Sequence, residues 1–202
     1  MHSHQVGTSL RAHNPARRDL TGDCDPAPPV LTGRTDPDTP MTDPIRPATD
    51  RDEDAIWQLL EPVFRAGETY AIERDIDRAT ALAWWCGGDH SAYVLEEGGA
   101  ILGTYYITPN QRGGGAHVCN CGFVTATAAQ GRGVARRMLA HALATARAMG
   151  YAAMQFNCVV TTNTRAVALW QAHGFEIVGR LPGAFDHPRS DRVDALVMYR
   201  HL

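Results

Sequence analysis

Lysine is absent from the 202 residues of this chain. Its absence excludes a catalytic lysine that forms a Schiff base with a carbonyl substrate. It also excludes a Walker A loop, whose lysine binds the phosphates of a nucleotide. Arginine therefore carries all 19 basic charges, and the 22 acidic residues bring the formal net charge to −3. A chain so close to neutral has no basic surface of the kind that binds nucleic acid.

The first quarter of the chain is poor in aromatic and aliphatic residues. The first aromatic residue of the chain is Trp57, and residues 1–40 contain six of the 12 prolines but only five valines, leucines and isoleucines. Such a segment buries too little apolar surface to offset the entropy cost of ordering it. We therefore expect residues 1–41 to be a disordered N-terminal extension and residues 42–202 to be one folded domain. Because folded-looking sequence begins abruptly at Met41, we also expect translation to start there.

The N-terminal segment also lacks a continuous apolar stretch, so we expect neither a secretory signal nor contact with a membrane. The five cysteines are an odd number, and their spacing is unlike that of a zinc site. Cys119 and Cys121 lie two residues apart, which places both on one face of a strand. Buried, reduced thiols in a cytoplasmic protein explain this pattern better than a metal or redox site.

Apolar periodicity predicts a mixed order of strands and helices. The clearest helix has its apolar stripe at Val134, Met138, Leu139 and onward, and Gly150 ends it. The first predicted helix is capped by Thr49 or Asp50, and the other predicted helices cover 77–85, 134–149 and 164–173. The predicted strands are 45–48, 92–96, 101–107, 117–124, 153–160, 175–180 and 193–199. This order is typical of an α/β (α+β) fold with helices on both faces of a mixed sheet. It is not the order of a doubly wound nucleotide-binding fold.

Two glycines stand at the mouth of that long helix, in the stretch AAQGRGVARRML. The first amides of a helix lack partners and attract anions, and phosphate is their usual occupant. Without side chains at Gly131 and Gly133, phosphate oxygens would reach the amides of Arg132 through Ala135, with charge added by Arg132 and Arg136. The alternative is a tight turn that binds nothing. A dinucleotide fingerprint is excluded because Arg136 stands where its third glycine is needed.

The segment Gln130-x-x-Gly133-x-Ala135 resembles the pyrophosphate loop of the GNAT family of acyl-CoA-dependent N-acyltransferases. A second segment, NTRAVALWQAHGF, is similar to a later motif of that family, with Asn163, Ala166, Leu169, Gly174 and Phe175 in register. The resemblance implies a GNAT fold over residues 42–202, with a mostly antiparallel twisted sheet of six to seven strands whose central strands splay apart. It also implies acetyl-CoA as co-substrate and no metal.

By the same resemblance, the arm of coenzyme A enters between the strand that ends at Val124 and Thr125 and the strand that begins near Ala153. The implied cofactor-binding residues are Val124, Thr125, Gln130, Gly131, Arg132, Gly133, Val134, Ala135, Asn163 and Trp170. Trp170 stands where many members carry a tyrosine that protonates the departing thiolate, and an indole is no useful acid. That role is vacant, filled by water or taken by another group. Core packing against Phe175 is an equal explanation of Trp170.

The acceptor end has no carboxylate on the strand at 117–124, where a general base could sit. Glu68, in the loop that the family uses as a lid, and His117 are the candidates, against the plainer alternatives of a solvated acid and a structural histidine. A water chain could also remove the proton from the attacking amine.

Asn120 and Asn157 fall at similar depth on the two strands that are expected to diverge. The strings HVCNCGFV, FNCVVTTNT and YYITPN are similar to fungal acetyltransferases of proline analogues such as azetidine-2-carboxylate. That resemblance implies that Asn120 and Asn157 are catalytic, orienting the acceptor and stabilising the transition state, and that Glu68 and Tyr106 contact the substrate. The alternative is that both asparagines pair with the backbone across the sheet gap.

The sequence thus predicts a cytoplasmic N-acetyltransferase that acetylates a small amine or amino acid in a ternary complex with acetyl-CoA. Two alternatives stay open. One is an acetyltransferase of protein N-termini, and the other is a sensor or partner-binding module that binds acyl-CoA without turnover. A homodimer is one alternative for the oligomeric state.

Overall fold

The computed structural model describes residues 44–202 of the chain. The predictions made for residues 1–43, which include the disordered extension and the translation start at Met41, lie outside the described residues. The helices are α1 (Glu53–Ala66), α2 (Arg78–Cys86), α3 (Val134–Ala148) and α4 (Thr164–Ala172). The strands are β1 (Ile45–Pro47), β2 (Ser91–Glu97), β3 (Ala100–Pro109), β4 (Val118–Thr125), β5 (Ala153–Val160), β6 (Glu176–Asp186) and β7 (Arg192–His201).

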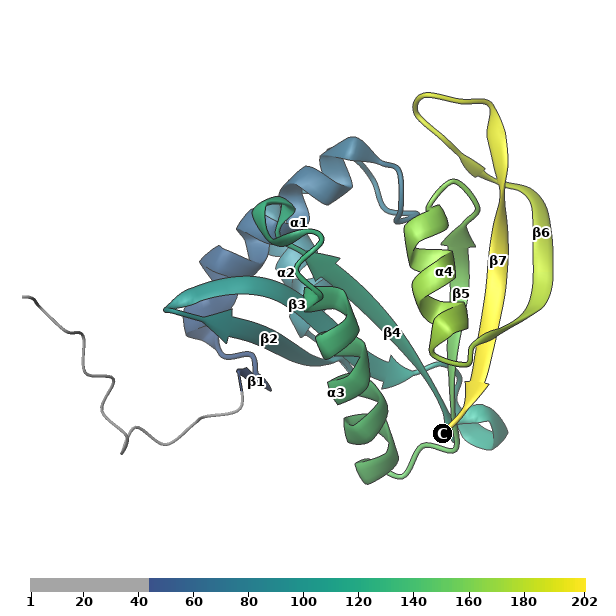
Figure 1. Ribbon diagram of the computed structural model, residues 1–202. Helices are drawn as coiled ribbons and strands as arrows, with labels where there is room; N and C mark the ends of the chain where they lie inside the picture. Colours follow the sequence, from purple (N-terminus) through teal and green to yellow (C-terminus); the bar gives the residue numbers. More distant parts are fainter. Residues whose placement is uncertain (1–43) are drawn as a thin grey trace, which may run out of the picture. The chain divides into compact units, whose positions relative to one another are not determined.

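The strands form one seven-stranded sheet in the order β1-β2-β3-β4-β5-β7-β6 (Figure 1). Its neighbouring strands are antiparallel except β4 and β5, which are parallel. The prediction of a mixed, mostly antiparallel sheet of six to seven strands is therefore confirmed. The predicted order of helices and strands along the chain is confirmed as well.

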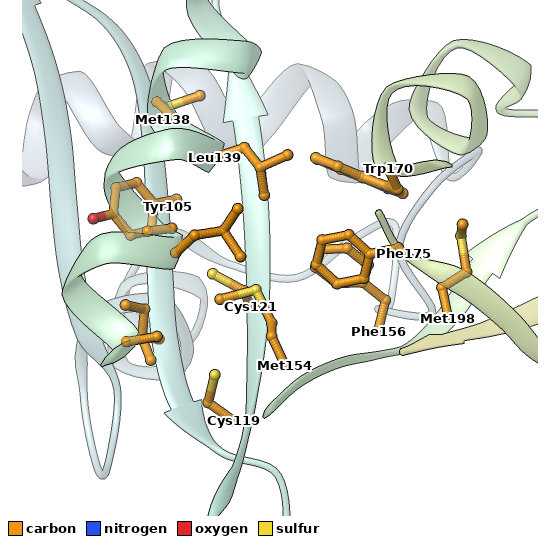
Figure 2. Close-up of a cluster of buried hydrophobic side chains, with 14 of the residues drawn as sticks. Tyr105, Cys119, Cys121, Met138, Leu139, Met154, Phe156, Trp170, Phe175 and Met198 are labelled. Atoms are coloured by element: carbon orange, nitrogen blue, oxygen red, sulfur yellow. The ribbon is translucent and has the colours of Figure 1, made fainter. Parts of the chain in front are cut away.

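Helices cover both faces of the sheet because side chains alternate along each strand. Tyr105 points into a core beneath α3 and α4, and its neighbour Tyr106 points into a second core beneath α1 and α2. Figure 2 shows the first core, in which Met138 of α3 lies near Tyr105, and Leu139 lies toward an aromatic group of Phe156, Trp170 and Phe175. The ring centroids of Phe156 and Phe175 are 4.6 Å apart. The two cores fix the sheet between the helices.

Strand β6 is longer than the sequence predicts. The prediction ended it at Arg180, but β6 continues through Pro182 and Gly183 to Asp186. It is the last strand of the sheet, and its register with β7 shifts between Leu181 and Phe185. An edge strand tolerates proline at such an irregularity because one of its sides needs no hydrogen-bond donors.

Strand β4 accepts a large aromatic ring from β3 because it carries glycine at the opposing position. Tyr106 pairs with Gly122, and a Cβ at Gly122 would lie 2.4 Å from Cε1 of the Tyr106 ring. That ring cannot retreat easily, since it stacks on His90 at 4.2 Å and meets the edge of Trp85 at 4.9 Å. Tyr106 is therefore held flat against β4.

We expect Gly122→Ala to lower the free energy of unfolding by about 1–3 kcal/mol, the usual cost of overpacking a filled core. Chemical denaturation followed by fluorescence measures this loss. Gly114→Ala is the matched control, because a Cβ at Gly114 meets nothing within 4 Å. Equal stability of the two variants would contradict the packing described for Tyr106.

Candidate functional site

A pocket of about 1030 Å³ opens where β4 and β5 separate. Most of its walls come from the loop between α1 and α2, strand β4, the turn and first residues of α3, strand β5 and helix α4, and single residues of α1, α2 and β3 complete them. Figure 1 shows β4 and β5 running apart from a common end, with α3 and α4 on one side. The pocket therefore lies at the junction between the two halves of the sheet.

Only the first residues of β4 and β5 pair with each other, Val118 with Ala153 and Cys119 with Met154. The next link is made by a side chain, because the amide of Asn120 donates to the backbone carbonyl of Gln155 at 2.9 Å. Beyond this link the strands diverge, as the resemblance implied. Asn120 thus joins the two strands at the point where their backbones part, which is the alternative role considered for it from the sequence.

Strand β5 is irregular just beyond that link. Its pairing with β7 passes from Phe156 opposite Met198 to Val159 opposite Leu196, so that two residues of β5 face one of β7. The extra residue makes a bulge at Asn157 and Cys158, both of which are exposed and line the pocket. Bulges commonly redirect side chains beside active sites. The predicted catalytic Asn157 is placed in the pocket by this bulge.

Only every second residue of β4 turns its backbone N–H and C=O groups toward the gap. The N–H of Phe123 donates to the hydroxyl of Tyr70 at 2.9 Å, and that hydroxyl donates to the carbonyl of Phe123 at 3.0 Å. Backbone groups alternate in direction along an antiparallel strand, so Phe123 and Thr125 face the gap. Val124 faces β3, where its carbonyl lies 3.1 Å from a Cβ built on Gly103. Of the two strand-edge residues named from the sequence, only Thr125 offers its backbone to the gap.

The turn at Gly131 and Gly133 before α3, called the glycine loop below, has the bare backbone that the sequence predicts. Gly131 and Gly133 both have φ of 78°, and a Cβ on either would project into open space. Helix α3 begins at Val134, which is 1% exposed and anchors the helix in the core. Left-handed backbone is costly for residues with a side chain, so glycine is required at both turns. These residues line one end of the pocket.

The amides that are free for a ligand are shifted by one residue from the prediction. The N–H of Arg132 donates to the carbonyl of Ala129 at 3.3 Å, and the helical bonding of α3 begins with the N–H of Arg137 to the carbonyl of Gly133 at 3.1 Å. The amides without a helical partner are therefore those of residues 133–136, not 132–135.

Arg132 itself is turned away from the pocket. Its guanidinium lies 3.5 Å from the carboxylate of Glu97, which Arg137 also contacts, and Arg132 is not among the residues that line the pocket. Arg136 does line the pocket, and so does Arg165 at the start of α4. Two helix N-termini and two arginines thus meet at this end. Such an arrangement binds anions.

Asn163 and Trp170, the two α4 residues predicted to bind cofactor, both line the pocket. Asn163 caps α4, because its side-chain oxygen accepts the N–H of Ala166 at 3.2 Å. Trp170 is 8% exposed and packs against Phe123 and Phe156, with ring centroids 5.2 Å and 4.8 Å away. Core packing of Trp170 is therefore shown. Its indole is no acid, so it cannot protonate a leaving group.

Tyr106 lies at the opposite end of the pocket from the glycine loop, beneath α1 and α2. Its hydroxyl donates to the side-chain oxygen of Asn120 at 3.3 Å. Burial raises the pKa of Tyr106, and burial lowers the pKa of the stacked His90, so both rings are neutral near pH 7. Asn157 extends this polar group, since its amide donates to Asn110 at 2.7 Å and its oxygen accepts from Gln155 at 2.7 Å.

The two candidate general bases differ in position. Glu68 lines the pocket, and its carboxylate forms an ion pair with Arg189 of the loop between β6 and β7. The pair joins loops from the two halves of the sheet at the edge of the pocket. His117 does not begin β4 as predicted; it lies exposed in the preceding turn and does not line the pocket. The strand starts one residue later, at Val118.

Tyr70 was not predicted from the sequence, although it lines the pocket and its hydroxyl bonds to the backbone of Phe123. The ring lies against Phe64 at 5.8 Å and Trp85 at 5.9 Å. Burial raises its pKa well above the ordinary value. Its nearest signal in the sequence is Glu68 two residues earlier, but nothing local indicates a contact with Phe123, 53 positions away.

Two further expectations concern thiols and metals. Cys119 and Cys121 are buried and reduced as predicted, whereas Cys158 is exposed at the pocket wall. Within residues 44–202, no three or more histidines, cysteines and acids are placed to hold a metal ion. None of the helices in this range is long and apolar enough to cross a membrane.

Comparison with known proteins gives a consistent result. The model of the acetyltransferase (GNAT) family matches residues 53–175. A stretch of 85 residues is 32% identical to N-acetyltransferase aca1 of Schizosaccharomyces pombe, and it covers 42% of this chain and 41% of that protein. The match therefore spans about two fifths of that fungal relative.

Solved structures are similar over the described residues. A GCN5-related N-acetyltransferase from Kribbella flavida is 40% identical with a TM-score of 0.74, covering 78% of this chain and 96% of that one. A phosphinothricin acetyltransferase from Sinorhizobium meliloti, solved in complex with acetyl-CoA, is 20% identical with a TM-score of 0.69, covering 78% and 87%. At that identity the second likeness concerns the fold alone.

We expect Asn120→Ala to lower the free energy of unfolding by about 1–2 kcal/mol, because it leaves the Gln155 carbonyl and the Tyr106 hydroxyl without their partner. Asn157→Ala is the control, since its exposed side chain bonds only to other side chains, and we expect a change within about 0.5 kcal/mol. Urea denaturation of both variants makes the comparison. An unchanged Asn120→Ala protein would mean that this side chain does not hold the strands together.

Proposed function

Because the chain belongs to the GNAT family of acetyltransferases, we propose that it transfers the acetyl group of acetyl-CoA to the amine of a small molecule or amino acid. The observation that carries the proposal is one pocket with two chemically different ends. One end holds the glycine loop, two helix N-termini and two arginines, which suit a diphosphate. The other end holds the amides of Asn120 and Asn157, which suit a small polar acceptor.

The residues around the glycine loop fit the diphosphate of coenzyme A. The free amides of residues 133–136 point from the start of α3, and the open space at Gly131 and Gly133 lets phosphate oxygens approach them. Arg136 and Arg165 supply opposite charge at the rim of the pocket. Gln130, also at this wall, adds a neutral donor.

The gap between β4 and β5 fits the pantetheine arm, whose amide groups can pair with a strand edge. Thr125 offers its backbone to the gap, and Trp170 with Phe156 forms an apolar wall. The bound acetyl-CoA supplies an acetyl thioester. Phe156 and Trp170 would shield the arm from water, and Asn120 and Asn157 line the same pocket as these rings.

The acceptor end supports direct attack by a neutral amine. Asn157 is exposed in the pocket and held by Gln155 and Asn110, so its amide is oriented for a polar group of the acceptor. Glu68 is the one acid among the described pocket residues, and Arg189 already pairs with it. Water therefore takes the proton from the amine, and the catalytic gain comes from positioning and hydrogen bonding.

Acetylation of protein N-termini is the second candidate function. A ribosomal-protein-alanine N-acetyltransferase from Brucella melitensis has a similar fold, at 24% identity and a TM-score of 0.69. However, the Glu68–Arg189 ion pair links two loops beside the pocket. A long peptide would have to pass this link, and this favours the small acceptor.

We expect Gly133→Ala to raise the dissociation constant of acetyl-CoA at least tenfold, a loss of about 1.4 kcal/mol, because its Cβ occupies the space beside the free amides. Calorimetry measures the binding. Gly150→Ala is the matched control at the far end of α3, where glycine has φ of 88° and equally open surroundings. Both variants carry the strain of left-handed backbone, so similar losses of stability are expected. Equal affinity in the two variants would contradict binding at the glycine loop.

We expect the wild-type protein to release free coenzyme A thiol when acetyl-CoA is mixed with small amines and amino acids, as measured with a chromogenic disulfide. Mass spectrometry identifies the acetylated acceptor. Asn157→Ala should lower kcat about tenfold or more and leave the dissociation constant of acetyl-CoA within twofold, since it removes an interaction with the acceptor.

The alternatives give different outcomes in the same assay. A non-catalytic sensor would bind acetyl-CoA and release no thiol with any acceptor. An N-terminal acetyltransferase would prefer peptides to free amino acids. Two earlier expectations, a homodimer and a cytoplasmic location, stay predictions.

A further inference from the structure

Tyr70, which lines the pocket, places its hydroxyl group on the edge of β4 that faces the gap. Its oxygen accepts the N–H of Phe123 at 2.9 Å, and its proton goes to the carbonyl of the same residue at 3.0 Å. These are the two backbone groups that a neighbouring strand would bind if β5 had not turned away. The hydroxyl therefore occupies the position that a ligand in the gap must share.

The position of Tyr70 is built into the fold rather than being a chance contact of a loop. Its ring is surrounded by Phe64, Trp84 and Trp85 in edge-to-face contacts. The loop that carries it is braced at its two ends, because Arg65 donates to the carbonyl of Ile76 at 2.9 Å and Arg74 donates to the carbonyl of Arg65 at 2.9 Å. A hydroxyl held in this way is preorganised.

The other polar groups near this point have other tasks. One N–H of the Asn120 amide is bonded to the Gln155 carbonyl, and the Asn120 oxygen accepts from Tyr106. Trp170 is packed among aromatic rings and lacks an acidic proton. Tyr70 is the residue whose hydroxyl bonds directly to the N–H of Phe123. It stands on the loop between α1 and α2, far in sequence from α4.

We propose that Tyr70 is a catalytic residue, whose hydroxyl and the N–H of Phe123 together donate hydrogen bonds to the thioester carbonyl oxygen during acetyl transfer. In the free protein the two groups bond to each other. When the carbonyl oxygen arrives, the hydroxyl proton rotates from the Phe123 carbonyl toward it, and the Phe123 N–H is released to the same oxygen. This inference rests on the proposed function.

The reaction that these donors assist balances without a change at Tyr70. The amine nitrogen bonds to the carbonyl carbon, the carbon–sulfur bond breaks, and the thiolate leaves with the electron pair. The proton of the amine passes to water, and Tyr70 keeps its own proton throughout. The raised pKa of Tyr70 agrees with this role, because a phenol that stays protonated above neutral pH donates a hydrogen bond and does not act as a base.

The test compares Tyr70→Phe with the wild-type protein over its full length. The variant keeps the ring in its aromatic contacts and removes only the hydroxyl. We expect kcat to fall about 100–1,000-fold, as for other lost oxyanion donors. The dissociation constant of acetyl-CoA should stay within about threefold. The factor by which kcat falls should be the same from pH 6 to 9, because no proton is exchanged at this residue.

Tyr93→Phe is the matched control, since Tyr93 lies on β2, stacks on Tyr105 at 4.9 Å and does not line the pocket. It should keep wild-type kcat. Melting temperatures of both variants check that each is folded at the assay temperature. A fall in kcat that merely follows a loss of folded protein would contradict the proposal.

A second measurement does not require turnover. Isotope-edited infrared spectra of acetyl-CoA labelled at the thioester carbonyl, bound without acceptor, report the hydrogen bonds to that oxygen. The stretch should lie at lower wavenumber in the wild-type protein than in Tyr70→Phe. Equal stretches together with equal kcat would overturn the role of Tyr70. If the wild-type protein binds acetyl-CoA but acetylates nothing, the proposed function fails, whereas the infrared comparison still decides whether Tyr70 contacts the carbonyl.

Discussion

The parting of β4 and β5 is the constraint on which the rest of the structure depends. Two strands that pair only at Val118–Ala153 and Cys119–Met154 leave the remaining edge of each without partners. Unpaired backbone groups in the interior are costly, so each must find another partner. Asn120 supplies one to the carbonyl of Gln155, and Tyr70 supplies two to Phe123. The pocket exists because side chains, and not a strand, complete the sheet there.

The same constraint gives the pocket its chemistry. Side chains of each strand alternate between the two faces of the sheet, so the gap is bordered by different side chains on each face. On the α3–α4 face it meets aromatic packing around Trp170 and two helix N-termini, which suit a long anionic ligand. On the α1–α2 face it meets Tyr106 and the asparagines, which suit a small polar acceptor. In the proposed acetyl transfer, the two substrates meet in this gap.

Much of this arrangement could be predicted because it is encoded locally. The helical stripe from Val134, the glycines at 131 and 133, and the segment that ends in Phe175 each reflect energies decided within a few residues. These patterns predicted the order of helices and strands, the helix that follows the glycine loop, and the family. The predictions that differ from the structure are those that depend on how distant segments pair. Val124 lines the pocket, but its backbone serves β3 and not the gap, and Arg132 was expected at the ligand but pairs with Glu97.

The sequence by itself determined the sheet-and-helix order, the bare backbone at the glycine loop and the membership in an acetyltransferase family, since short-range propensities and motifs carry that information. Only the tertiary structure decided which residues face the gap. The bulge at Asn157, the bridge from Asn120 to Gln155 and the contact between Tyr70 and Phe123 all depend on the register of segments far apart in the chain. A shift of one residue in such pairing turns every side chain to the other face, and no local pattern records it.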